Sequence, residues 1–404
     1  MKLETFEIHF ENPRGVFSAG DQVKGHVIVK LRNPMKIRKI SLYFEGRSKS
    51  HWEVRHGRSK TDYRANETYI CETFELYDMG QGGADHPAGD HSYTFCLQLP
   101  STLPSSFEGR RGYVRYFCKA SINRPWKFDE HTKRAFTVIH HLDLNVVPTA
   151  GMPVWGEQDE TIEGICCSSG NVQIRLALNK TGYVPGEPVI YTIDVFNKCD
   201  FNIEQVELEL KQLVTYTGYS NSIFSSGHPK HHTKLDTFSL FSTTNRIKKN
   251  CEEHINRAAP VPALPPSRLE GCGIIDISYF VGLKVHVRWT TVTLEREIVI
   301  GTVPMRFVPS RESASPARSI ATAPSAPPME PPPYSEPPPS YEESVFGRVE
   351  IRDENDDEHT SGQMGWAPSY PVYHYDAARQ HFQILPAVPA QEVPSGAPPA
   401  YNQI

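Results

Sequence analysis

This sequence contains no long apolar run. No stretch of its 404 residues approaches the ~18 consecutive apolar residues of a membrane-spanning helix. The N-terminal residues MKLETFEIHF carry charge where a secretory signal would be apolar, so we expect no signal peptide. Eight cysteines without regular spacing favour free thiols of a cytosolic protein over a disulfide framework. The adjacent Cys166 and Cys167 fit either two strand thiols facing opposite sides or a redox pair.

Catalytic motifs are also lacking. The sequence holds no phosphate-cradling glycine loop, no nucleophile elbow and no HExxH pair. Carboxylate pairs occur, but no spacing orders them for acid–base chemistry. The pairs His228/His231 and Cys251/His254 have a loosely zinc-like spacing, and an exposed loop without metal is the competing interpretation. We therefore predict a protein that is not an enzyme, has no metal and no cofactor, and binds no nucleic acid.

The first 308 residues show no long 3.6-residue period, which excludes a helical body. Apolar and polar residues instead alternate, as strands with one buried face require. Turn residues such as Pro185-Gly186-Glu187-Pro188 separate these runs. The pattern predicts an all-β body built of antiparallel sandwiches. The alternating apolar positions include Tyr93, Phe95, Leu97, Leu99, Val172, Ile174, Leu176, Leu178, Val189, Tyr191, Ile193, Val195, Ile275, Ile277, Tyr279, Leu283, Val285, Val287 and Trp289.

The body also repeats itself. Residues 16–23 resemble residues 182–189, and each stretch is followed by a similar apolar strand pattern. Residues 103–109 resemble residues 265–271 in the same order. Two collinear matches indicate duplicated domains of ~150 residues. We place these domains at residues 1–150 and 165–308, with the boundary in the proline- and glycine-rich stretch between them.

Residues 309–404 differ sharply in composition. They hold 18 of the 34 prolines and no lysine, and they include an acidic run from Asp353 to Glu358. Their net charge is −8, whereas residues 1–150 carry +5. A segment of this kind buries too little apolar surface to offset its ordering entropy. We predict a disordered, Pro-rich tail that is partly polyproline II.

The tail contains three PPxY motifs. Polyproline II has three residues per turn, so the first proline and the tyrosine of each motif share a face. A WW domain offers an aromatic groove for that proline and a pocket for the tyrosine. A proline-rich spacer that matches the pattern by chance is the alternative. The predicted WW-binding residues are Pro331, Pro332, Tyr334, Pro338, Pro339, Tyr341, Pro398, Pro399 and Tyr401.

Two further features of the tail suggest functions. Pro324, Ser325, Ala326 and Pro327 form a PSAP sequence similar to the peptide read by the ubiquitin-E2-variant domain of ESCRT-I; a chance match is the alternative. A ubiquitin ligase bound to a tail without lysine would have to modify a bound protein or lysines of the body. Chance drift in composition explains the lack of lysine equally well.

The first domain carries the densest positive stretch of the chain. It fits contact with anionic lipid head groups or an acidic cargo segment, and a solvated sheet face is the alternative. Fold-back of the acidic tail onto it is a further hypothesis. The stretch comprises Lys36, Arg38, Lys39, Arg47, Lys49, Arg55, Arg58, Lys60 and Arg64.

These features together resemble the arrestins, and specifically the alpha-arrestins, also called arrestin domain-containing proteins. The resemblance rests on Phe17 to Val27, on Leu99 to Gly109 followed by Tyr113, and on Val261 to Ser267 with Gly271-Cys272. It covers residues 3–308 and the tail motifs. It implies two arrestin-like antiparallel β-sandwich domains joined by a short hinge and followed by a disordered Pro-rich tail.

The resemblance also implies a function. Alpha-arrestins are cytosolic adaptors that link membrane receptors or transporters to WW-domain HECT ubiquitin ligases, and are recruited to plasma membrane and endosomes. They thereby control ubiquitination, endocytic trafficking, degradation or vesicle budding. PSAP beside PPxY resembles the subtype that recruits ESCRT-I. The alternative is a thioredoxin-binding redox or metabolic regulator of the same family.

Overall fold

The structure is a computed structural model, and it confirms the all-β body. No helix among the residues described is long and apolar enough to cross a membrane. Two single-turn 3-10 segments, η1 (Leu144–Val146) and η2 (Ser267–Leu269), interrupt the strands. The described residues are 2–57, 59–163, 169–220, 228–243, 245–306 and 340–375.

The N-terminal sandwich packs a three-stranded sheet against a larger one. The smaller sheet consists of β1 (Leu3–Phe10), β3 (Gln22–Leu31) and β8 (Gly89–Gln98). Its partner runs in the order β6 (Ser59–Asp78), β5 (Lys39–His56), β10 (Gly112–Asn123), β11 (Glu130–Ile139) and β2 (Val16–Ser18), with β9 (Phe107–Gly109) beside β10. A small ribbon of β4 (Met35–Ile37) and β7 (Ala84–His86) lies apart from both.

The C-terminal sandwich repeats this plan. One sheet consists of β12 (Val154–Glu163), β13 (Ser169–Leu178), β15 (Pro188–Lys198) and β18 (Cys251–Pro260). The other consists of β14 (Gly182–Tyr183), β20 (Thr290–Ile300), β19 (Ile275–Val287), β16 (Ile203–Ser220) and β17 (Lys230–Thr243). Strand β12 precedes residue 165, where we placed the start of this domain.

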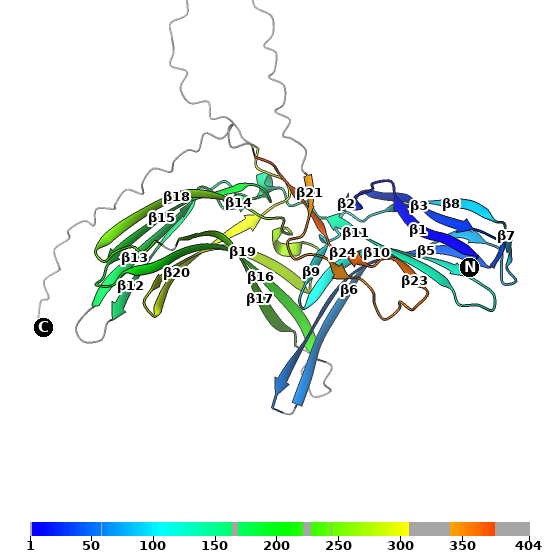
Figure 1. Cartoon of the computed structure of the whole chain (residues 1–404), viewed down its shortest axis with the longest axis horizontal. Coiled ribbons are helices and arrows are strands. Elements are labelled where there is room, and N and C mark those ends of the chain that lie inside the picture. Colours follow the sequence, from blue (N-terminus) through cyan, green and yellow to red (C-terminus); the bar gives the residue numbers. More distant parts are fainter. Residues whose placement is uncertain are drawn as a thin grey trace, which may run out of the picture.

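The two larger sheets join into one. Strand β16 pairs with β6 at Tyr219–Arg64 and Ser220–Tyr63, which makes a continuous 12-stranded sheet across both domains. Figure 1 shows the sandwiches along the long axis, with the long β5–β6 hairpin descending between them. The hydroxyl of Ser50 in β5 donates to the carbonyl of Thr217 in β16 at 2.6 Å. Both domains are therefore held together by backbone as well as side-chain contacts.

The internal repeat has a counterpart in hydrogen bonding. Buried Tyr116 of β10 donates to the carbonyl of Pro104 at 2.7 Å. Buried Tyr279 of β19, at the matching place, donates to the carbonyl of Pro265 at 2.8 Å. In each domain a short early strand, β2 or β14, also pairs parallel with the last strand of its sheet. The two domains are thus copies of one plan.

The alternating apolar pattern matches the observed core, except that Tyr93 is only partly buried and Trp289 is exposed. Val172, Ile174 and Leu176 are fully buried, as the two-residue period predicts. Trp289 extends the same alternation but is 67% exposed, because it lies in the turn between β19 and β20. The adjacent Arg288 has a positive φ of 51° and turns the chain before the pattern reaches the indole.

Part of the predicted disordered tail is ordered, which corrects that expectation for residues 340–375. They form β21 (Ser340–Glu343), β22 (Val349–Glu350), β23 (Thr360–Gln363), β24 (Gly365–Trp366) and β25 (Ser369–Val372). Figure 1 shows these orange and red strands against the N-terminal sandwich. The physical reason lies in composition: this stretch holds only two of the tail's 18 prolines and contains apolar residues, including Ile351 and Tyr370, that are buried.

Candidate functional site

Most of the predicted motif residues lie outside the described part of the chain. These are the ESCRT-I-like residues 324–327, both prolines of the second PPxY motif (Pro338, Pro339), and the predicted WW-binding residues Pro331, Pro332, Tyr334, Pro398, Pro399 and Tyr401. Tyr341, the tyrosine of the second motif, is described. The docked segment 340–375 that carries it is therefore the part of the candidate site whose geometry can be analysed.

Tyr341 is part of a small ladder. Strand β21 pairs antiparallel with β25, and Tyr341 lies opposite Pro371. The half-buried ring packs against the cluster of Val16, Ile139 and Tyr370, and the guanidinium of Arg14 lies 5.9 Å from its centroid. Two of these neighbours belong to β2 and β11, so the body of the first domain provides the surface on which the tyrosine rests.

An acidic clamp anchors the middle of the segment. Its acids are Asp353 and Asp356, and its bases are Lys133 of β11, Lys119 of β10 and Arg47 of β5. Lys133 Nζ lies 2.9 Å from a carboxylate oxygen of Asp353 and 2.7 Å from one of Asp356. Lys119 Nζ lies 2.9 Å from Asp356, and Arg47 lies 3.0 Å from Asp353. The clamp therefore joins the acidic run to three strands of one sheet.

The centre of this clamp is buried. The side chains of Lys133 and Asp356 are each 1% exposed. Burial by itself would raise the pKa of Asp356, but hydrogen bonds from Lys133 and Lys119 outweigh it and lower the pKa to about 2. Burial also opposes ionisation of Asp353, yet Lys133 lowers its pKa too. The Lys133 ammonium further lies 4.1 Å from the centroid of the Phe117 ring.

Apolar and backbone contacts support the clamp. Ile351 is fully buried against Phe117 and Ala135. Strand β23 pairs parallel with β11 at residues 131–134, next to the stretch of β11 that β2 covers. The hydroxyl of buried Tyr370 donates to the carbonyl of Ser106 at 3.0 Å. The segment thus adds a strand and a small core to the first domain.

The end of the segment reaches the second domain. The backbone N–H of Tyr373 donates to the carbonyl of Pro185 at 2.9 Å. Its hydroxyl donates to the carbonyl of Thr302 at 2.9 Å. Gly186, at a φ of 86°, lies so close that a Cβ there would meet the Tyr373 carbonyl oxygen at 2.0 Å. The docked segment therefore bridges both domains.

The acidic run of the tail does fold back onto the first domain, as the sequence suggested, but most of the basic residues it contacts are not the predicted ones. Of the predicted basic stretch, Arg47 contacts the acidic run. Lys60 and Arg64 instead pair with Glu53 and Asp62 on the β5–β6 hairpin. The half-buried Lys119 and the buried Lys133 come from sequence regions without a basic cluster. The charge asymmetry pointed to such a contact; only the strand arrangement brings these lysines together.

One member of each pair with zinc-like spacing has another partner. His254 Nδ1 lies 2.6 Å from Asp194, and His231 Nδ1 lies 3.0 Å from the hydroxyl of Thr217. Among the described residues, ligand atoms close enough for a metal are found in His51, Glu53 and Asp62. All three of these side chains are partly exposed, as acidic surface groups commonly are without a metal.

The described cysteines are free. Cys71, Cys96 and Cys251 are exposed, Cys272 is half-buried, and Cys118 and Cys199 are buried. Burial raises the pKa of Cys118 and Cys272, which makes these thiols poorer nucleophiles. Cys166 and Cys167 lie outside the described residues.

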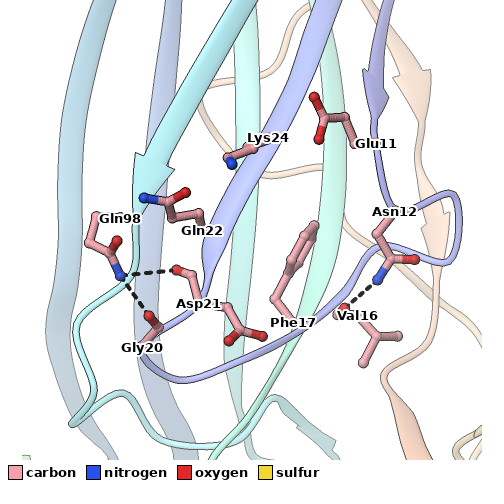
Figure 2. Close-up of a pocket in the computed structure, with 9 residues that line it drawn as sticks. All are labelled: Glu11, Asn12, Val16, Phe17, Gly20, Asp21, Gln22, Lys24 and Gln98. Carbon is pink, nitrogen blue, oxygen red and sulfur yellow. Dashed lines mark hydrogen bonds between the residues drawn. The ribbon is translucent and has the colours of Figure 1, made fainter.

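An open hollow of about 560 Å³ lies beside the repeated turn of the first domain (Figure 2). Gln98 Nε2 donates to the carbonyl of Gly20 at 2.6 Å, and Asn12 Nδ2 donates to that of Val16 at 2.6 Å. These amides therefore brace backbone turns, and the hollow provides no grouping of catalytic side chains.

Comparisons with known proteins agree with this architecture. The family model for the N-terminal domain of arrestin (or S-antigen) matches residues 6–145, and that for the C-terminal domain matches residues 168–305. Arrestin domain-containing protein 17 of Caenorhabditis elegans is 28% identical, with 100% of this chain and 92% of the relative aligned. Arrestin domain-containing protein 1 of Mus musculus is 28% identical, with 81% and 72% aligned. Arrestin domain-containing protein 4 of Homo sapiens is 27% identical, with 78% and 75% aligned.

The two family models match the N-terminal and the C-terminal sandwich in turn. The similarity to the Caenorhabditis elegans relative extends through the docked segment. The chain belongs to the arrestin-domain protein family, in its alpha-arrestin branch.

Proposed function

We propose that this protein is a non-catalytic adaptor that links membrane-protein cargo to WW-domain HECT ubiquitin ligases. One observation carries the proposal: an arrestin-domain body is joined to a tail with three PPxY motifs. The body holds cargo, and the tail recruits the ligase. Recruitment takes place at plasma membrane and endosomes, where the cargo resides.

The architecture supports this division of labour. A continuous sheet spans both domains, so the body is a firm platform for a cargo segment. The tail has no lysine, so a ligase docked on it transfers ubiquitin elsewhere. Lys248 and Lys249 of the body are exposed acceptors, and the cargo supplies others. The acceptor is thereby kept apart from the recruiting segment.

The PSAP residues Pro324 to Pro327 extend the proposal to ESCRT-I and vesicle budding. Their place seven residues before the first PPxY motif would allow one tail to collect both machineries. The thioredoxin-binding alternative has less support in the part of the chain that the structure describes: Cys118 and Cys199 are buried, and burial raises the pKa of Cys118 and Cys272.

The test is binding of purified tandem WW domains to the full chain. Changing Tyr334, Tyr341 and Tyr401 together to Ala should weaken binding at least about tenfold, because each tyrosine fills the second WW pocket. Tyr375→Ala is the matched control: it alters a tail tyrosine outside any PPxY motif. Undiminished binding by the triple variant would refute ligase recruitment through these motifs.

A further inference from the structure

Tyr341 takes part in a second interaction that its role in a PPxY motif does not require. Its backbone lies in the β21–β25 ladder, where Ser340 faces Val372 and Glu342 faces Tyr370. Its ring rests on Val16 and Tyr370. This tyrosine is therefore held in strand geometry by the chain itself.

A WW domain would need the same residue in another form. PPxY peptides bind in polyproline II conformation, with the tyrosine ring inserted into a pocket of the partner. A ring packed on Val16, Ile139 and Tyr370 cannot enter that pocket at the same time. Pairing with Pro371 also covers one side of the backbone. Docking of the segment and binding of a WW domain at Tyr341 are thus mutually exclusive.

We infer that residues 340–375 are an intramolecular competitor that masks the second PPxY motif, so that a ligase reaches Tyr341 only after the segment leaves the body. This inference rests on the proposed function, because it takes the partner of Tyr341 to be a WW domain. It concerns the second motif alone, because Tyr334 and Tyr401 lie outside the described residues.

The contacts that hold residues 340–375 on the body lie outside the second PPxY motif. Asp353 and Asp356 clamp the segment to Lys133, and Tyr370 places its hydroxyl on Ser106. If these tail residues are changed, the docked state loses its anchors while both sandwiches keep their own sequence. Neutral amides at 353 and 356 would leave the ammonium of Lys133 buried without a counter-charge, which favours release of the segment into water.

The expected loss of affinity for a WW domain follows from the fraction of chains in which the segment is undocked. The apparent dissociation constant equals the intrinsic one divided by the competent fraction, so a segment docked in nine chains of ten weakens binding about tenfold. We expect at least this reduction at the second motif, and its removal in variants that undock the segment.

The experiment compares one motif in two settings. Binding of a single purified WW domain is measured first to a synthetic peptide of residues 335–344, and then to the full chain carrying Tyr334→Ala and Tyr401→Ala. We expect the chain to bind at least about tenfold more weakly than the peptide. Adding Asp353→Asn with Asp356→Asn should restore binding towards that of the peptide.

Matched control variants distinguish release of the segment from a simple loss of negative charge. Glu354→Gln with Glu358→Gln removes the same charge from the same run, but Glu358 is 88% exposed and neither is part of the clamp, so binding should stay weak. Tyr370→Ala offers a second route to release and should also restore binding.

The outcomes are distinct. Equal affinity of the peptide and the full chain would overturn the masking inference and leave ligase recruitment intact. A peptide that fails to bind any WW domain tested would instead overturn the proposed role of this motif. Weak binding that persists in both Asp353→Asn/Asp356→Asn and Tyr370→Ala chains would show that docking of residues 340–375 is not its cause.

Discussion

The buried ion pairs between body and tail dominate at the scale of single residues. Lys133 is almost fully buried and is met by two carboxylates, Asp353 and Asp356. Taking such charges out of water costs several kcal/mol, and the pairing offsets this only when every partner is present. A segment that lacked these two acids would therefore leave the buried ammonium of Lys133 without a counter-charge. These residues act as a recognition device for one segment rather than as a general source of stability.

Asp356 gives this device a defined pH dependence. Its pKa falls from an ordinary 3.8 to about 2 in the docked state. Its contribution is then fully present above pH ~4 and is lost as the pH falls through about 2, because the undocked carboxylate protonates first. The shift corresponds to about 2 kcal/mol. Asp356→Asn should lower stability by about that amount at pH 7, measured by denaturant unfolding.

The difference between wild type and Asp356→Asn should shrink as the pH approaches 2. Glu358→Gln provides the control, because that side chain is 88% exposed, and should leave the profile unchanged. A constant difference from pH 7 down to pH 2 would contradict the assignment of the ionic contribution to Asp356.

At the scale of elements, the outer edge of β11 is covered in two pieces. Strand β2 pairs with residues 137–139, and β23 pairs with residues 131–134. An uncovered strand edge offers free N–H and C=O groups to other chains. The tail therefore completes an edge that the first domain leaves open. Because the residues of β23 lie 229 positions from their partners in β11, no local pattern reveals this pairing.

The repeated turn allows a controlled test at this scale. Gly20 and Gly186 occupy matching positions, with φ values of 92° and 86°. A Cβ on Gly20 would find its nearest neighbour at 3.6 Å, whereas one on Gly186 would meet the Tyr373 carbonyl oxygen at 2.0 Å. Both Gly→Ala changes should cost ~1–2 kcal/mol of backbone strain. Gly186→Ala should in addition displace the segment end.

Hydrogen exchange checks this prediction. The amides of Ser369, Tyr370, Val372 and Tyr373 should exchange faster in Gly186→Ala and at the wild-type rate in Gly20→Ala. If both variants left exchange at residues 369–373 unaltered, the contact between the segment and the second domain would not be a stabilising one.

At the scale of the whole molecule, several contacts connect the domains, and two of them join distant parts of the chain. One is the pairing of β16 with β6, which fuses their sheets. The other is the docked segment, which contacts Lys133 in the first domain and Pro185 and Thr302 in the second. The adaptor proposed above thus has a body whose shape depends partly on its own tail. Release of the tail for ligase binding would loosen that shape.

Truncation tests this coupling. A chain ending at residue 339 loses every described tail contact, and we expect a loss of about 2 kcal/mol or more, which lowers the melting temperature by roughly 4–8 °C. Small-angle X-ray scattering should show a wider range of domain arrangements. A chain ending at residue 375 keeps those contacts and should melt like the full chain. Equal melting temperatures of the two truncated chains would contradict the prediction that the docked segment stabilises the body.

Local sequence patterns are enough to predict the β architecture and the division into two copies. Alternation at Val172, Ile174 and Leu176 requires a strand with one buried face, and that requirement is local. The matching turns at Gly20 and Gly186 likewise mark the duplication without reference to tertiary contacts. The PPxY and PSAP motifs are linear, so they too are evident from sequence, although whether they are used stays a prediction.

Docking of the tail, in contrast, depends on tertiary contacts. Average composition favours disorder for residues 309–404, but docking depends on a few residues: Ile351, Asp353, Asp356 and Tyr370 meet a surface assembled from strands far apart in sequence. Lys119 and Lys133 become one cationic site because β10 and β11 are neighbours in the sheet. Such long-range complementarity leaves no period and no motif, so it emerges only when the chain is folded.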